Sequence, residues 1–389
     1  MKKYPGQFFT ILFFFVLFVI GPAAAGCAGT DDYDVKIETI DGVKVVANPA
    51  YPRDGKVKLK LKHELTIGDD EEAEVLIYHP LNVQADKTGN IYIWEYTLSC
   101  LKVFDRQGRF LRQIGRRGQG PGEFSANTRF TLLNENKIYL IDANKRRITI
   151  FSTKGEFIKD FRYDSQWFCP HLRSDGKSQL YTFRSVTSFE GKLKSNYQAF
   201  ESEKHLYRFD TITNEWHLLS VFGGEQRVLR GFGENGAEGF STPFSIVWNV
   251  DSRGNIITGL NKTYSLDVYS SQGKLMFKFS RDVEPKKNKD AKKLRKLFGS
   301  ISKVFEFLPA FGSKILLDEQ GRIWVEQHKQ DDRYKNVAYD IFSKDGIYMK
   351  RVVFPYRIYQ FKNNKVYGIA VSKNDERVIK RTAILSGLD

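Results

Sequence analysis

Cysteine and histidine are scarce in this chain of 389 residues. The three cysteines, Cys27, Cys100 and Cys169, cannot build the disulfide framework of a small secreted domain. We expect Cys100 and Cys169 to be separate thiols that act as small apolar side chains, with a single bridge between them as the alternative. The six histidines show no close spacing with cysteine or carboxylate residues that would hold a metal ion. The sequence therefore predicts no metal site and no cofactor.

Recognisable catalytic motifs are also missing. The sequence contains no nucleophile elbow, no phosphate-binding loop and no zinc-protease helix. Gly118, Gly120 and Gly122 do not form a nucleotide loop, because no helix that starts with Lys-Ser or Lys-Thr follows them. A site assembled from distant strands would escape this test. The sequence thus favours a protein that is not an enzyme, without excluding catalysis.

Aromatic residues and basic residues are abundant. The chain has 31 Phe and 19 Tyr, and 41% of its residues are hydrophobic, which is enough for a large core of aromatic and β-branched side chains. Its formal net charge is +15, which favours anionic partners.

The N-terminus has the pattern of an export signal. Lys2 and Lys3 precede an apolar run at 8–20, and small residues follow up to Cys27. We expect residues 1–26 to be a signal peptide. Small residues directly before a cysteine resemble bacterial lipoprotein signals, although Ala24 stands where leucine is usual. That resemblance implies a lipid at Cys27 and a cell-envelope lipoprotein, in the outer membrane or periplasm of a Gram-negative cell.

Cleavage after 23–25, at an Ala-x-Ala site, is the alternative, and it would release the protein without a lipid. We expect residues 27–56 to be a linker. An exported protein is a poor candidate for binding nucleic acid, despite its positive charge.

A unit of strands and turns repeats along the chain. Each unit has a first turn rich in Asp or Asn and a second turn in which an aromatic residue stands four positions before Gly. Proline starts the first strand of most units, where no hydrogen bond of the sheet is lost. The predicted units are 80–114, 125–161, 168–221, 243–280, 309–353 and 355–385.

The last unit has at most three strands, so a ring of such units would leave an open edge. Residues 57–67 alternate between apolar and polar and precede the first unit. We infer that they supply the outer strand of the sixth unit. The sequence therefore predicts an all-β fold: a six-bladed β-propeller of four-stranded blades over 57–389, closed by an N-terminal strand.

Residues 89–93, 104–108 and 114–124 look like the repeat of NHL propellers. The whole layout resembles bacterial six-bladed propeller lipoproteins of the NHL-repeat and TolB-like superfamily, whose function is uncharacterised. Asp142 and Arg147 match a pair that braces a loop in that family, although Lys145 stands where Asn is usual. The resemblance implies a structural role for the pair.

Propellers bind ligands on the face where loops join strands two and three and where one blade leads to the next. Arg116, Arg117 and Arg230 lie near glycines in such loops, where guanidinium groups and backbone amides can receive an anion. Solvated loops with solubilising charge are the alternative. The loops predicted on this face are 115–123, 187–204, 222–242, 281–308 and 326–336.

The first strands of the blades converge on a central channel. Arg129, His171 and Arg357, together with Asn82, lie on predicted first strands and are candidates to line it. Because strands alternate, about half of such side chains would point elsewhere.

A cationic insertion interrupts the repeat between the fourth and fifth units. Seven positive residues and one negative residue lie within 286–296, and apolar residues follow at helical spacing. We expect a short amphipathic helix near 286–304. It either contacts a membrane or a polyanionic glycan, or caps the ring with its apolar side inward.

Two functions follow from these observations. The first is a monomeric binding or scaffold propeller, anchored in the envelope, that recognises a protein or an anionic glycan through its loop face. The second is a metal-dependent lyase or lactonase centred on the channel, of the kind known on related six-bladed folds.

Overall fold

The computed structural model describes residues 33–69, 75–134, 136–163, 171–186, 197–213, 215–232, 236–329 and 334–388. Residues 34–389 form one compact unit. The predicted signal peptide, Cys27 and Cys169 lie outside the described residues. Cys100 is a buried free thiol, and burial raises its pKa to about 11. Among the described residues, no helix has the length and apolar character needed to cross a membrane.

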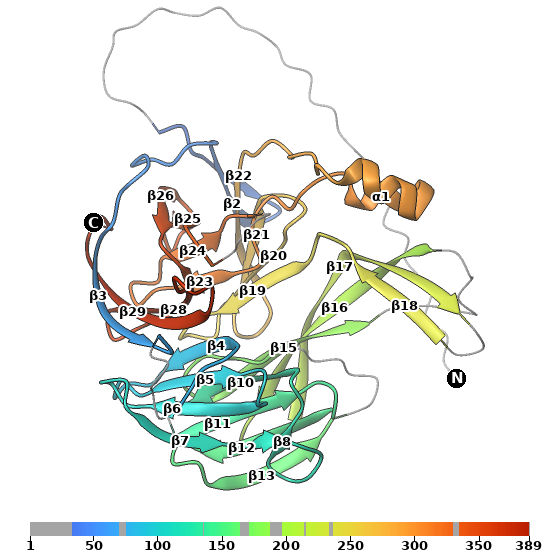
Figure 1. Cartoon of the computed structure of the whole chain (residues 1–389). Coiled ribbons are helices and arrows are strands. Elements are labelled where there is room, and N and C mark those ends of the chain that lie inside the picture. The colour runs from blue at the N-terminus through green and yellow to red at the C-terminus, as the bar shows by residue number, and fades with distance from the viewer. Residues whose placement is uncertain are drawn as a thin grey trace, which may run out of the picture. The chain divides into compact units, whose positions relative to one another are not determined.

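Six sheets, in which almost all neighbouring strands are antiparallel, follow one another along the chain (Figure 1). Blade one contains β4 (Pro80–Ala85), β5 (Ile91–Glu95), β6 (Cys100–Phe104) and β7 (Phe110–Ile114). Blade two contains β10 (Thr128–Leu133), β11 (Lys137–Asp142), β12 (Arg147–Ser152) and β13 (Phe157–Arg162). Blade five contains β23 (Ile315–Leu317), β24 (Ile323–Glu326), β25 (Val337–Phe342) and β26 (Tyr348–Phe354).

The ring closes as the sequence predicted. Blade six consists of β27 (Arg357–Lys362), β28 (Lys365–Val371) and β29 (Arg377–Ser386), and β3 (Lys60–Ile67) pairs antiparallel with β29 as its outer strand. The first strands touch in the order β4, β10, β14, β19, β23, β27 and back to β4, so they surround a common axis. The six-bladed all-β fold is therefore confirmed.

Two blades are larger than the predicted four strands. Blade three contains β14 (Arg173–Ser174), β15 (Gln179–Val186), β16 (Gln198–Asp210), β17 (Glu215–Phe232) and β18 (Gly236–Ser241). Much of 222–242, which we expected to be a loop, is therefore strand, because β17 pairs with β16 as far as Leu229 and with β18 from Arg227 onward.

Blade four contains β19 (Ile246–Val250), β20 (Ile256–Leu260), β21 (Ser265–Tyr269) and β22 (Leu275–Arg281), extended by β2 (Val43–Asn48) and β1 (Lys36–Ile40). β1 and β2 form a hairpin, and β2 runs parallel to β22. The prediction of a linker over 27–56 is thus wrong for 36–48. Pairing with β22 satisfies the backbone of β2 and covers the outer edge of the blade.

Residues 43–67 form a strap along the outer edges of three consecutive blades. After β2 leaves blade four, the backbone N–H groups of Arg53 and Val57 donate to β26 of blade five, and β3 then joins blade six. Asn48 lies at the first junction: its amide donates to the carbonyls of Ser280 and Gly346, and its oxygen accepts from the Tyr348 N–H. The strap therefore links blades four, five and six.

A buried carboxylate fastens the same region from within. Asp340 has no exposed surface and accepts hydrogen bonds from the hydroxyls of Tyr264 and Tyr348 at 2.8 and 2.6 Å. It also pairs with Arg281 and Arg351 at 2.8 and 2.7 Å. Because its polar neighbours come from blades four and five, we assign this cluster a structural role.

Turn chemistry explains the regular spacing of the blades. In the first turns, Asp86 accepts the backbone N–H of Asn90, and Asp251 accepts that of Asn255. The glycine of the latter turn, Gly254, has a φ of 82°, a conformation that favours glycine. These contacts confirm the first-turn pattern in the sequence.

Polar side chains at the end of the second strands hold the segments that enter each blade. Each is an acid or an amide that accepts a backbone N–H from the approach to the first strand of its own blade. The pairs are Glu95 with His79, Asp142 with Ser125, Asn261 with Ser245 and Glu326 with Ser313.

The core lies between neighbouring blades rather than at the axis. The aromatic residues before the second turns pack there: Phe104 contacts a cluster that includes Tyr367 of blade six, and Phe342 of blade five lies 5.0 Å from Phe279 of blade four, ring centre to ring centre. The cavity along the axis is lined by polar and apolar side chains together.

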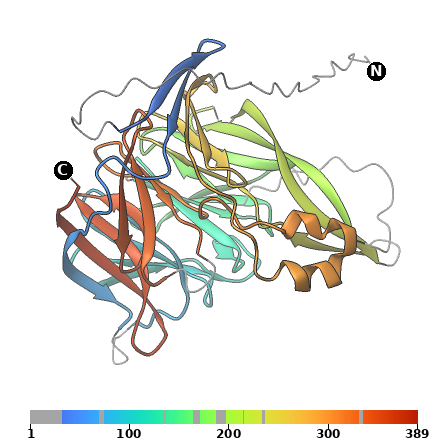
Figure 2. The ribbon, with the colours of Figure 1, turned by 90° about the horizontal axis from the view of Figure 1, so that it is seen from above.

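The predicted helical insertion is present. α1 (Ala291–Phe298) is followed by the 3₁₀ helix η1 (Gly299–Phe305), and Figures 1 and 2 show α1 beside the long ribbon of β16 and β17. Phe298 stacks on Phe305 and meets Tyr197 edge to face, each at 5.0 Å between ring centres. None of the residues of α1 is buried, so the helix packs at the margin of the ring.

Candidate functional site

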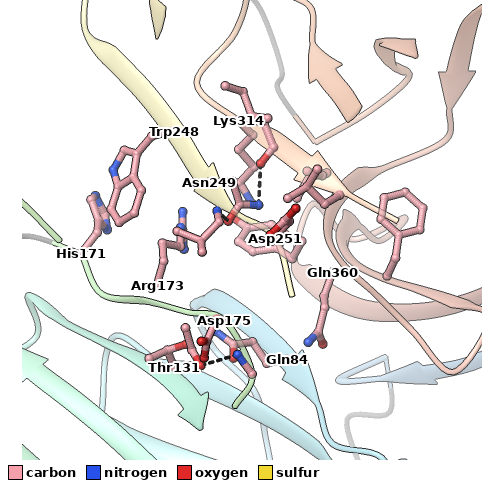
Figure 3. Close-up of a pocket in the computed structure, with 18 of the residues that line it drawn as sticks. Gln84, Thr131, His171, Arg173, Asp175, Trp248, Asn249, Asp251, Lys314 and Gln360 are labelled. Atoms are coloured by element: carbon pink, nitrogen blue, oxygen red, sulfur yellow. Dashed lines mark hydrogen bonds between the residues drawn. The ribbon is translucent and has the colours of Figure 1, made fainter. Parts of the chain in front are cut away.

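The six first strands line a cavity of about 1150 Å³ along the axis. Of the six predicted binding residues, the structure brings Arg129, His171 and Arg357 together in this channel, and Asn82 lines it as well. They lie at the end where the first strands begin, which is also the end of the interblade loops. Figure 3 shows part of the channel wall.

Amide side chains on three first strands tie neighbouring blades to one another. The amide of Gln84 in blade one donates to Phe130 of blade two at 3.1 Å. Asn249 of blade four donates to Ile315 of blade five at 2.9 Å. In the same way, Gln360 of blade six accepts a backbone N–H of blade one at 2.5 Å. These amides satisfy the edges of adjacent sheets, so their role is structural.

Blades two, three and five instead place cations in the channel. Arg129 and Arg173 come from β10 and β14, and Lys314 directly precedes β23. Arg129 donates to the Thr128 carbonyl at 3.0 Å, and Lys314 donates to the carbonyl of Ile358 at 3.3 Å. Within the described part of the chain, none of the three forms an ion pair with a carboxylate. We call Arg129, Arg173 and Lys314 the channel cations.

The channel cations destabilise one another's charge. Burial, followed by the charge of Arg129, lowers the pKa of the Arg173 guanidinium to about 10. Burial and then the charge of Arg357 lower the pKa of Lys314 well below its ordinary value. The buried Nε of Arg173 has no hydrogen-bond partner. Glu326 opposes this effect at Lys314, but it is itself paired with Arg357, so the protein's own acids compensate only part of the positive charge here, which costs free energy.

The positive charges of the channel also act on His171. It has accessible surface inside the channel, yet many protein atoms surround it, so its charged form is poorly solvated. This burial, together with Arg173, Arg129 and other nearby cations, lowers the pKa of His171 to about 3. His171 is therefore neutral at neutral pH, where either a ring nitrogen or a ring N–H is free to meet a ligand.

Arg357 differs from the channel cations because it is paired. Its Nε and Nη2 lie 2.7 and 2.8 Å from the two carboxylate oxygens of Glu326, and both side chains are more than nine-tenths buried. Nη2 also donates to the Ser313 hydroxyl at 2.6 Å. This carboxylate raises the pKa of Arg357, against the effect of burial. Arg357 therefore braces the wall that carries Lys314.

The acids of the channel lie near its other end and are occupied. Asp175, Asp251 and Asp318 line the cavity in the first turns of their blades. Each accepts backbone N–H groups of its own turn; Asp318, for example, accepts those of Gln320 and Arg322 at 3.1 and 2.9 Å. Basic residues of these turns, such as Lys177 and Arg253, also line the cavity at this end, so the channel cations are distinguished by their burial and by the absence of an ion pair with a described carboxylate.

The other predicted binding residues lie outside the channel. Arg116 and Arg117 form β8, which pairs with β9 (Glu123–Phe124), and both are exposed. Arg116 pairs with Glu123 at 2.9 Å. Arg230, on β17, lies over the ring of Tyr197 at 4.7 Å. The sequence placed these three arginines on the loop face, apart from the channel residues, and none of them is among the residues that line the cavity.

The bracing pair that the family resemblance implied is present. Asp142 accepts the backbone N–H and the hydroxyl of Ser125, each at 2.7 Å. Arg147 donates to the carbonyls of Gly120 and Glu123 at 3.0 and 2.6 Å. Lys145 also donates to the Glu123 carbonyl, at 3.0 Å. These contacts hold the loop before blade two and leave Asp142 and Arg147 no part in the channel.

Sequence reasoning missed Arg173 and Lys314. Arg173 stands two residues after His171, so alternation along an extended strand was a signal that both face the axis. Lys314 carried no such signal, because the prediction started the first strand of blade five at Pro309, whereas β23 begins at Ile315.

The described residues contain no group of three or more His, Cys, Asp or Glu side chains placed to hold a metal ion. His171 has cations around it rather than further ligands. A metal-dependent reaction in the channel therefore gains no support from this part of the chain.

The sequence matches the DUF5128 family of six-bladed β-propellers over residues 71–258. The six-bladed fold of the structure agrees with the description of that family. No curated protein matches the chain.

Two solved structures share the fold at low identity. An exported protein from Bacteroides fragilis is 13% identical, with a TM-score of 0.51, and the match covers 88% of this chain and all of that one. A member of the DUF4221 family from Bacteroides vulgatus is 12% identical, with a TM-score of 0.52 over 83% and 97% of the two chains. Virginiamycin B lyase from Staphylococcus aureus is 9% identical with a TM-score of 0.44, over 84% and 100%.

Proposed function

We propose that this protein is an exported binding propeller that captures an anionic ligand at the cationic end of its channel. The observation that carries the proposal is the convergence of Arg129, Arg173 and Lys314 from three blades without a carboxylate partner in the described residues. A bound anion would supply the missing charge and the missing hydrogen-bond acceptors. We therefore place the ligand site at the channel mouth, which is one of the two regions that the sequence suggested, rather than at the loop arginines.

The shape of the cavity supports a ligand larger than an ion. Pockets for small organic ligands typically measure about 300–1,000 Å³. At about 1150 Å³ the channel has room for the anionic end of a glycan. Amide, hydroxyl and aromatic side chains surround the cations, a wall that suits a polar organic molecule. We therefore favour an anionic saccharide over a protein partner.

Placement in the envelope is the second part of the proposal. It rests on the signal pattern in 1–26 and on Cys27, where a lipid would anchor the chain. Incorporation of a labelled fatty acid into the full-length protein, and its loss in Cys27→Ser, would support the anchor. If the exported protein carries no fatty acid and begins at residue 26, after cleavage at the Ala-x-Ala site of residues 23–25, the protein is instead released without a lipid.

Calorimetry on the purified protein tests the binding function. We expect saccharides that carry phosphate, sulfate or carboxylate groups to bind, and neutral analogues to bind far more weakly. Replacing the three channel cations with Gln should abolish binding. A matched control replaces Arg106, Arg109 and Lys154, which are exposed in second turns, and removes the same net charge.

Three results are informative. Loss of binding in the channel variant alone supports the proposal. Equal loss in both variants means that net charge, and not the channel, attracts the ligand. Binding that survives in the channel variant, or no binding of any anion by the natural protein, refutes the assignment.

A further inference from the structure

The channel mouth requires more than one negative charge. Burial is the main cause of the low pKa values of Arg173 and Lys314, and neighbouring cations add to it: Arg129 acts on Arg173, and Arg357 and then Arg173 act on Lys314, against the opposing charge of Glu326. Lys204 also lines the cavity and contributes to the field at His171. Glu326 is already engaged with Arg357. A ligand with a single negative charge would leave most of this positive charge without a partner.

The geometry points to a phosphate monoester, free in solution or at the end of a saccharide, as the group that the channel recognises. This inference rests on the proposed function and narrows it to one ligand chemistry. The channel cations would recognise the charge and the terminal oxygens of the phosphate group, whatever saccharide is attached to it.

Phosphate fits the donors better than carboxylate does. Two guanidinium groups from adjacent blades and the amino group of Lys314, just before the first strand of blade five, line the same cavity, and the charge of Arg173 lies close enough to act on Lys314. A phosphate monoester presents three terminal oxygens and a charge of about −1.5 to −2 at pH 7, and guanidinium forks match such oxygens in pairs. A carboxylate presents two oxygens and one negative charge.

The hydrogen bonds of Arg173 and Lys314 leave donors unused. The Nε of Arg173 is enclosed by protein and makes no hydrogen bond, and the planar group lies beside Trp248, 5.8 Å from the ring centre, so a ligand would have to meet its other guanidinium nitrogens. Lys314 lies over the ring of Tyr359 and makes one long hydrogen bond, of 3.3 Å, to a carbonyl. A lysine amino group has two N–H donors when neutral and three when charged, so at least one remains for a ligand in either state. A phosphoryl group bound by Arg173 and Lys314 would therefore lie near the aromatic rings of Trp248 and Tyr359.

Titration of the ligand, rather than of the protein, gives the sharpest test. A phosphate monoester gains its second negative charge near pH 6, whereas a sulfate ester keeps one charge throughout. We would measure the binding of glucose 6-phosphate, glucose 6-sulfate, glucuronate and inorganic phosphate by calorimetry at pH 5.0 and 7.5. Glucose 6-sulfate serves as the control for protonation of the protein, since its own charge is constant.

We expect the affinity for glucose 6-phosphate to rise several-fold between pH 5.0 and 7.5, and that for glucose 6-sulfate to stay constant or to fall. At pH 7.5 the phosphate should bind at least tenfold more tightly than the sulfate or glucuronate. Inorganic phosphate should compete for the same site. Tighter binding of glucose 6-phosphate than of inorganic phosphate would show that the channel also contacts the sugar.

Variants separate the site from the fold. Arg129→Lys and Arg173→Lys keep the charge but lose the fork, so each should weaken phosphate binding roughly tenfold while melting normally. Arg173→Gln should weaken it further, by up to about a hundredfold. If Arg173→Gln does not fold, the lysine variants still test the inference.

Failure of this inference differs from failure of the proposed function. Equal affinities for phosphate, sulfate and carboxylate ligands, or the same pH dependence for phosphate and sulfate, would overturn the phosphate assignment and leave a general anion site. Binding of no anion at all would overturn both. Unchanged phosphate affinity in both lysine variants would also refute the role of the guanidinium forks.

Discussion

Replacing Arg357 with methionine should destabilise the protein although the ring remains intact. The substitution removes two short hydrogen bonds to Glu326, at 2.7 and 2.8 Å, and leaves a carboxylate whose side chain is 7% exposed. Removing one partner of a buried ion pair costs about 3–5 kcal/mol, chiefly because the remaining charge is uncompensated. The backbone N–H of Ser313, 3.3 Å from Glu326, is too weak a substitute. We therefore expect a loss of about 3–5 kcal/mol in the free energy of unfolding.

A double-mutant cycle isolates the pair. Glu326→Leu alone should also destabilise, because it leaves the guanidinium of Arg357 without its carboxylate; the double variant should lose less than the sum of the two single losses. Urea unfolding at pH 7 provides the four free energies. The exposed pair of Arg116 and Glu123 is the control, and Arg116→Met should cost at most about 1 kcal/mol. Additive losses at Arg357 and Glu326 would refute the argument that they form a buried structural pair.

Two further predictions concern the strap and the channel. Asn48→Ala should lower the free energy of unfolding by about 2–3 kcal/mol, because two carbonyls and one N–H of blades four and five lose their hydrogen-bond partner. Amide hydrogen exchange should increase first in β22 and β26. Unchanged protection of these two strands would contradict the role of the strap. His171 has a folded-state pKa of about 3, below its unfolded value near 6.5, so the unfolded chain binds the extra proton and stability should fall as pH drops from about 6.5 toward 3. Thermal midpoints of the natural protein and His171→Asn between pH 7.5 and 4.5 measure this, and equal acid sensitivity of the two would show that His171 is not the group responsible.

Turn residues made most of the ring predictable. Aspartate in the first turn and an aromatic residue four positions before glycine in the second are local signals, and each acts within a few residues of where it is read. The closure of the ring was predictable for a different reason. A last blade of three strands needs an outer strand, and residues 57–67 were an alternating segment that belonged to no other predicted blade. These inferences need no knowledge of how blades sit around the axis.

The N-terminal hairpin had a signal that the linker prediction overlooked. Asp41 and Gly42 stand between two runs that include Ile37 and Val45, and both turn residues have positive φ, of 50° and 77°. An Asp-Gly pair between apolar alternating runs is a strong hairpin pattern. What the sequence did not show is where the hairpin binds, because its pairing with β22 joins segments more than 200 residues apart.

The channel shows why sites assembled around an axis are harder to read than folds. A predicted strand boundary that is wrong by a few residues still identifies the blade, but it changes which side chains are expected to face the axis. Lys314 was missed for this reason, because β23 begins at Ile315. The type of residue does not identify the function either. Gln84 and Arg129 both line the channel, but the amide of Gln84 connects two blades, whereas Arg129 has no carboxylate partner in the described residues.

Overall net charge is a poor guide to this site for the same reason. A charge of +15 spread over the surface attracts any anion weakly and is screened by salt. Arg129, Arg173 and Lys314 contribute only a small part of that charge, but burial removes the water that would otherwise solvate them. The anion that compensates them recovers a larger free energy than it could at the rim. Specificity should therefore depend on these three residues much more than on the many exposed lysines.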